Sequence, residues 1–293
     1  MESSPIRNRL LLFAAAFLFS TGGAAIKSAT LTGWQVASFR SGVAALVLFL
    51  VLPEARRGWS WRIVPVAMAY AATLITFVLA NRLTTAADAI FLQSTAPLYL
   101  LLLGPLLLRE PIRGPDVWYM AAVGAGMTMF FLGTESAVAT APDPPRGNVV
   151  AAVSGLLYAV MLAGFRWLGR RPEGNSGIAT VALGNVLACL AALPMALPVK
   201  AVAADNLVVI LYLGVVQIGI AYLCFTRAIG HVPALEAATV LMLEPAMNPV
   251  WTWLVHGERP GLWSLAGGSV ILSATLVNTW RQRRAAGKRA AAQ

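Results

Sequence analysis

The residues of this sequence best suited to bind a charged solute lie inside long apolar stretches. Glu244 is one of them, and Asn248 and Trp251 follow it at i+4 and i+7, which places all three on one helical face. A carboxylate, an amide and an aromatic ring on one face can hold an ammonium group by charge, hydrogen bond and cation–π contact. Because a carboxylate in apolar surroundings must be paired, solvated or protonated, Glu244 is the first candidate for substrate binding.

Arg40 is a second charged residue inside an apolar stretch. If these apolar stretches are helices that cross a membrane, residue counts from their ends give the depths of Arg40 and Glu244. The two depths differ by about 6 Å in a hydrocarbon core about 30 Å thick. One interpretation is an Arg40–Glu244 ion pair that holds the helices together. Another is that Arg40 binds a substrate carboxylate while Glu244 binds its ammonium, as a zwitterionic amino acid requires. A third is that Arg40 extends toward the membrane surface.

The other candidate binding residues are aromatic, amide and hydroxyl side chains in further apolar stretches. Such a lining suits amphipathic solutes, and each of these side chains could instead serve helix packing or interhelical hydrogen bonding. The set is Gln93, Ser94, Tyr70, Phe77, Tyr99, Tyr158, Gln217 and Tyr222.

Two proline–glutamate pairs recur with the same spacing. Pro97 and Glu110 are thirteen residues apart, as are Pro245 and Glu258. A proline near mid-membrane frees one helical carbonyl, which is tolerated where protein or a wet cavity satisfies it. We therefore expect hinges at both prolines in the walls of a central cavity, with simple kinks in packed helices as the alternative. Each glutamate precedes a proline-containing turn and is predicted to cap the start of the next helix.

The composition indicates an integral membrane protein. Of the 293 residues 58% are hydrophobic and only 12% are charged, about half the charge of a soluble domain. Apolar runs of about 20 residues, the length that crosses a bilayer, recur ten times. They are 9–27, 34–53, 63–81, 86–108, 115–133, 147–167, 177–197, 206–226, 234–255 and 261–280.

The basic residues predict the orientation of these spans. With the N-terminus inside, 16 of the 22 Lys and Arg residues fall in inner segments and 5 in outer segments, which places both termini in the cytoplasm. The net charge of +10 is therefore explained by topology and anionic lipid rather than by nucleic-acid binding. The expected partners are the lipid bilayer and a small-molecule substrate, with no nucleic acid.

A Pro- and Asp-rich linker at 140–147 divides the chain into two halves of five spans. An odd number of spans per half makes equivalent helices cross the membrane in opposite directions, as in many secondary transporters. We predict an all-α membrane protein of ten transmembrane helices in two inverted five-helix repeats. The repeats are expected at 1–139 and 148–282, followed by a basic cytoplasmic tail at 283–293.

This arrangement resembles the EamA-type transporters of the drug/metabolite transporter superfamily. The similarity rests on two five-span halves, on Pro97 and Pro245 in spans four and nine, and on Glu110 and Glu258 at their ends. Within the superfamily the chain is most similar to the bacterial amino-acid exporters, including the aromatic branch. The resemblance implies an inner-membrane exporter of broad amino-acid and metabolite specificity that works by alternating access. A multidrug or lipid-linked sugar transporter is the alternative within the superfamily.

Residues for metal, cofactor or enzyme chemistry are missing from the sequence. His231 and His256 lie at span ends on opposite predicted sides, so they make no metal site. No nucleophile–base set and no phosphate-binding glycine loop with a lysine appears, so we expect no cofactor, and an intramembrane enzyme is a remote alternative. Both a monomer and a homodimer are compatible with the sequence.

Overall fold

A computed structural model describes residues 5–107, 112, 114–132, 136–169, 177–199, 203–229 and 231–290 of the chain. All the regular secondary structure in these ranges is helical, apart from one isolated antiparallel bridge between Val138 and Ala141. The prediction of an all-α protein is confirmed.

Helices in the first half fall into five stretches. They are α1 (Pro5–Ser20) with α2 (Gly22–Ser28), α3 (Gly33–Val51), α4 (Ile63–Leu83), α5 (Ala86–Gln93) with α6 (Ala96–Leu107), and α7 (Gly114–Leu132). A short 3₁₀ helix, η1 (Pro53–Arg56), connects α3 to α4.

The described helices of the second half fall into five stretches as well. They are α8 (Pro144–Gly169), α9 (Gly177–Ala196), α10 (Ala204–Leu211) with the π-helix η2 (Tyr212–Ile220) and α11 (Ala221–Ile229), α12 (Ala234–Leu241) with α13 (Leu243–His256), and α14 (Leu262–Ala290). Within the described ranges, eight stretches are long and apolar enough to cross a membrane. The α7 helix and the α12–α13 pair occupy the other two predicted spans.

Spans four and nine are interrupted at matching positions. The α5 and α12 helices contain eight residues each and start at 86 and 234, a separation of 148 residues. The α7 and α14 helices start at 114 and 262, with the same separation. The constant separation of 148 residues between matching helices confirms the internal repeat that the proline–glutamate spacing predicted.

The prolines explain where these two spans break. Pro97 lies in the first turn of α6, and Pro245 lies in the first turn of α13. A proline nitrogen carries no hydrogen, so it cannot bond the carbonyl four residues earlier, which belongs to Gln93 and to Leu241 respectively. Both α5 and α12 end at those residues. The chain thus has a break ahead of each proline.

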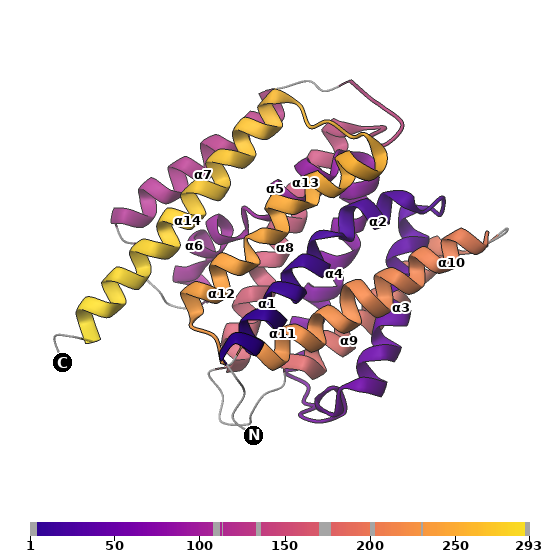
Figure 1. Ribbon diagram of the computed structural model, residues 1–293, viewed down its shortest axis with the longest axis horizontal. Helices are drawn as coiled ribbons and strands as arrows, with labels where there is room; N and C mark the ends of the chain where they lie inside the picture. Colours follow the sequence, from indigo (N-terminus) through magenta and orange to yellow (C-terminus); the bar gives the residue numbers. More distant parts are fainter. Residues whose placement is uncertain are drawn as a thin grey trace.

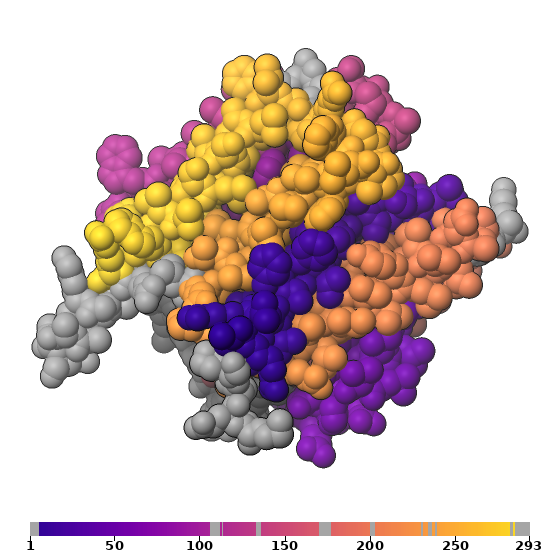
Figure 2. All heavy atoms as spheres, in the orientation of Figure 1, coloured from indigo at the N-terminus to yellow at the C-terminus, as the bar shows by residue number. Residues whose placement is uncertain are grey.

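The two halves of the chain are interlocked rather than side by side. The α4 helix packs on α8 and α9, α3 packs on α9, and α1 packs on α11 and α13. Figure 2 shows α1 running between the α11 and α13 segments of the second half. Residues from both repeats therefore line any space at the centre of the bundle.

The start of α1 and the end of α14 lie toward the same end of the bundle, in the lower half of Figure 1. We call this the terminal end, and the opposite end, where α2 finishes and α13 runs into α14, the far end. Large apolar side chains such as Leu46, Met68 and Val208 are exposed on the outside. Such an exterior suits hydrocarbon rather than water.

Candidate substrate site

Three polar side chains from three helices meet in the interior. The Tyr70 hydroxyl on α4 donates to the Tyr222 hydroxyl on α11 at 3.1 Å. The Asn185 amide on α9 donates to the Tyr70 hydroxyl at 3.4 Å. Tyr70 and Asn185 are almost fully buried, so these groups depend on each other for hydrogen bonds.

Arg40 lies beside these tyrosines. Its side chain, on α3, is fully enclosed, with 2% of the residue exposed, and it interacts electrostatically with Tyr70 and Tyr222. The guanidinium donates to the Leu74 carbonyl at 3.4 Å, and its Nε has no hydrogen-bond partner. No carboxylate in the described part of the chain forms an ion pair with it. A buried guanidinium with spare donors is a site for an anionic group.

Glu244 lies near one of these two tyrosines, Tyr222. It lies in the first turn of α13 and interacts electrostatically with Tyr158 on α8 and with Tyr222. The structure forms no direct Arg40–Glu244 ion pair, and Tyr222 interacts electrostatically with both groups. Residue counts predict similar depths in the membrane for Arg40 and Glu244, but they carry no information on the lateral distance between α3 and α13. The site is therefore a central cluster composed of Arg40, Tyr70, Tyr158, Asn185, Tyr222 and Glu244.

Asn248 and Trp251 share a helix with Glu244 but face other elements. The Trp251 indole donates to the Ser20 hydroxyl at 2.9 Å, and its ring meets Phe17 edge-on at 5.3 Å. Asn248 is buried against Gly23 of α2, and neither atom of its amide group has a hydrogen-bond partner. The three residues do not form one ammonium pocket in this conformation.

Gln217 lies in the π-helix η2, near the break between α1 and α2. Its amide nitrogen donates to the Phe19 carbonyl at 3.4 Å, and its Oε1 has no partner. A built-in π-helix often marks a functional position, since it opens the regular ladder of helical hydrogen bonds. Gln217 and Asn248 thus offer unsatisfied amide groups on either side of α2.

The candidates from spans three and four have packing partners. Gln93 donates to the Ser154 hydroxyl at 2.8 Å, and Ser94 donates to the Ile90 carbonyl at 2.7 Å. Phe77 packs in the apolar core. Tyr99 points to the sulfur of Met127 on α7, at 3.6 Å, and so lies apart from the central cluster.

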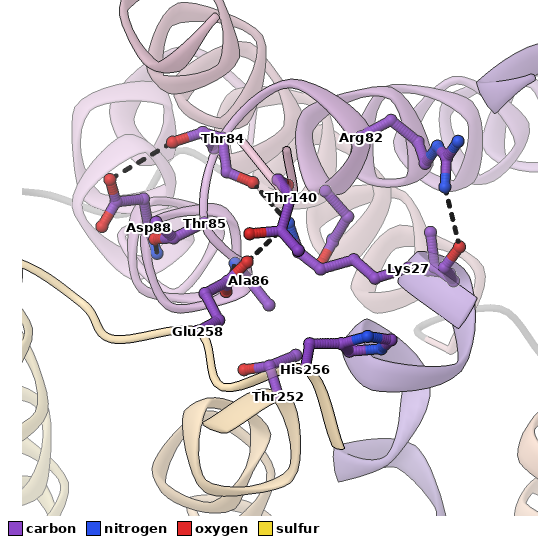
Figure 3. A network of polar contacts seen from close by, with 12 residues as sticks. Lys27, Arg82, Thr84, Thr85, Ala86, Asp88, Thr140, Thr252, His256 and Glu258 are labelled. Atoms are coloured by element: carbon purple, nitrogen blue, oxygen red, sulfur yellow. Dashed lines mark hydrogen bonds and ion pairs between the residues drawn. The ribbon is translucent and has the colours of Figure 1, made fainter. Parts of the chain in front are cut away.

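A second polar group lies at the far end (Figure 3), and it places Glu258 differently from the sequence prediction. Glu258 Oε1 accepts the backbone N–H of Ala86 at 2.7 Å. Glu258 therefore caps the start of α5, from the first repeat, rather than the next helix along the chain, α14. The sequence correctly predicted a capping role for Glu258 but the wrong helix, because spans one, four and nine meet at this end of the fold. Glu110 lies outside the described residues.

Two residues of these groups, Asn185 and Lys27, were not predicted as functional. Both are common types, and the packing of distant spans brings Asn185 to Tyr70 and Lys27 to Glu258, each more than 100 residues away. Asn185 had one available signal, an amide in the middle of an apolar run. Among the described residues no cluster of His, Cys, Asp and Glu could hold a metal ion.

Together the fold and the site define a class: a multi-pass helical membrane protein with an internal repeat and a buried polar cluster, as in a solute transporter. The sequence pattern of the EamA-like transporter family matches residues 8–132 and 145–280. The chain belongs to the EamA-like transporter family, which is a family of transporters and not of enzymes.

Individual relatives agree with the family. Pseudopaline exporters from two strains of Pseudomonas aeruginosa are 29% identical over 276 residues, which is 91% of this chain and 94% of theirs. An uncharacterized transporter of Clostridium kluyveri is 28% identical over 81 residues, covering 28% of this chain and 26% of its own. One solved crystal structure shares the fold, with a TM-score of 0.60, 20% identity, and coverage of 94% of this chain and 98% of that one.

Proposed function

We propose that this protein is a secondary exporter of solutes that carry both a carboxylate and an ammonium group. The observation that carries the proposal is Arg40, a buried guanidinium with an unpartnered Nε and no carboxylate partner among the described residues. Burying a charge without a partner is costly, so a chain keeps such a group where a ligand supplies the partner.

Each part of the central cluster has a role in this proposal. Arg40 binds the carboxylate, and Glu244 binds the ammonium group. The Tyr222 hydroxyl interacts with both charged groups, and it and the Tyr70 hydroxyl bonded to it offer hydrogen bonds to the polar atoms in the middle of the solute. Tyr158 adds an aromatic face next to Glu244, which suits a cation or an apolar side chain.

The substrates that fit are amino acids, aromatic ones included, and larger solutes built from them. The relatives named as pseudopaline exporters support export. The proposal includes a bacterial inner-membrane location with both termini in the cytoplasm, and fusions of a cytoplasm-dependent reporter to the two ends check the orientation. The proposed pathway lies within one chain, so a monomer is sufficient for it.

Alternating access in this proposal uses the breaks in spans four and nine. Repeats of opposite orientation can exchange conformations, which opens the central cluster to one side and then to the other. Proton coupling through Glu244 is the form of energy supply that the chain itself offers, because a membrane carboxylate can take up and release a proton during the cycle.

The experiment is an exchange assay with purified protein in liposomes. Vesicles are loaded with each of the twenty amino acids in turn and with an amino-acid-derived polycarboxylate, and exchange of labelled solute is measured with and without a pH gradient. Flux above empty liposomes for solutes with both charged groups supports the proposal. Flux of organic cations or lipid-linked sugars without any amino-acid flux contradicts it.

A further inference from the structure

A buried ion pair connects two spans from different repeats at the far end. Lys27 Nζ, in the last turn of α2, lies 2.8 Å from Glu258 Oε2, just beyond α13, and each side chain is only 2% exposed. The other oxygen of Glu258 accepts the Ala86 N–H at the start of α5. One carboxylate therefore joins α2, α5 and the end of α13 (Figure 3).

The Lys27 ammonium is fully engaged. Besides Glu258 it donates to the Thr84 carbonyl at 2.8 Å and to the Thr140 carbonyl in the segment between α7 and α8. An ammonium can donate three hydrogens, and Lys27 thus has two carbonyl acceptors and one ion-pair partner around it. The network spans four separate segments of the chain around one buried cation.

We infer that Lys27 and Glu258 form a latch that closes the far end of the transport pathway and must open for solute to leave there. In the predicted topology, the segments it joins are the outer pieces of three interrupted spans. A break separates α2 from α1 at Thr21, α5 from α6 after Gln93, and α13 from α12 at Met242. Each segment can therefore move at its break while the rest of its span stays packed.

The groups directly inside the latch fit this role. One helical turn before Lys27, Gly23 contacts Asn248, whose amide group is buried without hydrogen-bond partners. From Asn248, α13 leads one further turn inward to Glu244 in the central cluster. Opening the latch would thus connect the far end to the cluster through a side chain that is already able to bind a polar solute.

Among the described residues, the ion pair at the terminal end is much more exposed than the Lys27–Glu258 pair. The terminal-end pair joins Arg9 on α1 to Glu236 on α12 at 2.6 Å, with 56% and 33% of the two side chains exposed. An exposed pair in contact with water contributes little to holding helices together. The described conformation is therefore the one in which the far end is closed by charges that water does not reach.

The latch is tested by chemical labelling of a cysteine placed beneath it. Asn248→Cys is made in a chain whose two natural cysteines, Cys189 and Cys224, are replaced by alanine. A membrane-impermeant maleimide is added to cells from the outside, and the labelling rate is followed. Glu258→Gln is then added, which keeps an oxygen for the Ala86 N–H and removes the charge. Lys27→Met removes the opposite charge at similar length.

We expect each of these two substitutions to raise the labelling rate at least tenfold. The double variant should label no faster than the faster single variant, because either change alone already removes the pair. Arg9→Gln is the matched control, since it removes an ion pair at the terminal end, and it should leave the rate unchanged. Thr252→Cys, also buried beneath the latch, serves as a second reporter position.

Unchanged labelling in folded Glu258→Gln and Lys27→Met protein, at both reporter positions, would overturn the latch. Equal acceleration by Arg9→Gln would overturn it too, because any loosening of the bundle would then suffice. The latch rests on the proposed transport function. The labelling needs no substrate, so a missing response refutes the latch while the liposome exchange result stands on its own.

Discussion

Replacing Arg40 by methionine should strongly weaken substrate recognition and leave the fold intact. In the structure the Arg40 guanidinium makes one hydrogen bond, to the Leu74 carbonyl, and its length of 3.4 Å exceeds that of a normal hydrogen bond. Losing it costs about 1 kcal/mol at most. Removing a buried charge saves a desolvation cost of several kcal/mol, so the free energy of unfolding should stay level or rise.

The effect on transport should be much larger. A charge-assisted hydrogen bond from Arg40 to a substrate carboxylate contributes about 1.5–3 kcal/mol. At about 1.4 kcal/mol per factor of ten, the exchange efficiency for amino acids should fall roughly 10- to 100-fold in Arg40→Met. Liposome exchange gives the flux, and thermal unfolding in detergent gives the stability of the same sample.

Arg82 provides the matched control. Its guanidinium donates to the carbonyls of Ala29 at 2.8 Å and Ile26 at 3.4 Å, so it holds the α2–α3 turn against α4. Arg82→Met should lower thermal stability, with flux per folded molecule nearly unchanged. If Arg40→Met instead loses stability and flux in parallel, as expected of a structural arginine, the assignment of Arg40 to substrate binding is wrong.

Three further changes test other parts of the site. Glu244→Gln should lower amino-acid flux about tenfold by removing the charge opposite the ammonium, with expression and melting temperature unchanged; equal losses of folded protein and flux would assign Glu244 a structural role. Gly23→Ala should destabilise the protein by about 1–3 kcal/mol in thermal unfolding, because its Cβ would overlap the Asn248 side chain. Adding Asn248→Ala should recover that stability, and no recovery would exclude this contact as the cause. Pro97→Ala and Pro245→Ala should each raise the melting temperature and slow exchange several-fold by restoring a helical hydrogen bond, and faster exchange would argue against hinges.

The helices were predictable because bilayer thickness fixes their length. Apolar runs of about 20 residues marked each span, and the two prolines marked where α5 and α12 end. The interruption between α1 and α2 was not predicted, although Gly22 and Gly23 follow it, since glycine pairs also occur in straight membrane helices. The π-helix η2 has no distinctive sequence pattern.

The contacts between neighbouring spans could not be predicted from a single sequence. The spacing of Glu244, Asn248 and Trp251 correctly placed them on one helix, α13. It did not predict which neighbouring helices their side chains would contact. Lys27 was counted only as one basic residue near a membrane surface, and its buried partner is more than 200 residues away. By the separation of 148 residues Glu110 is the counterpart of Glu258, and its capping role stays a prediction.

In the proposed site, one solute is held at its carboxylate by Arg40 and at its ammonium by Glu244. The most direct measurement is equilibrium binding to purified wild-type, Arg40→Met and Glu244→Gln protein. Three ligands share one skeleton: an amino acid, its amide without the carboxylate, and its N-acetyl form without the ammonium. We predict that Arg40→Met binds the amino acid and its amide equally, and that Glu244→Gln binds the amino acid and its N-acetyl form equally. Equal loss of affinity for all three ligands in both variants would contradict the account.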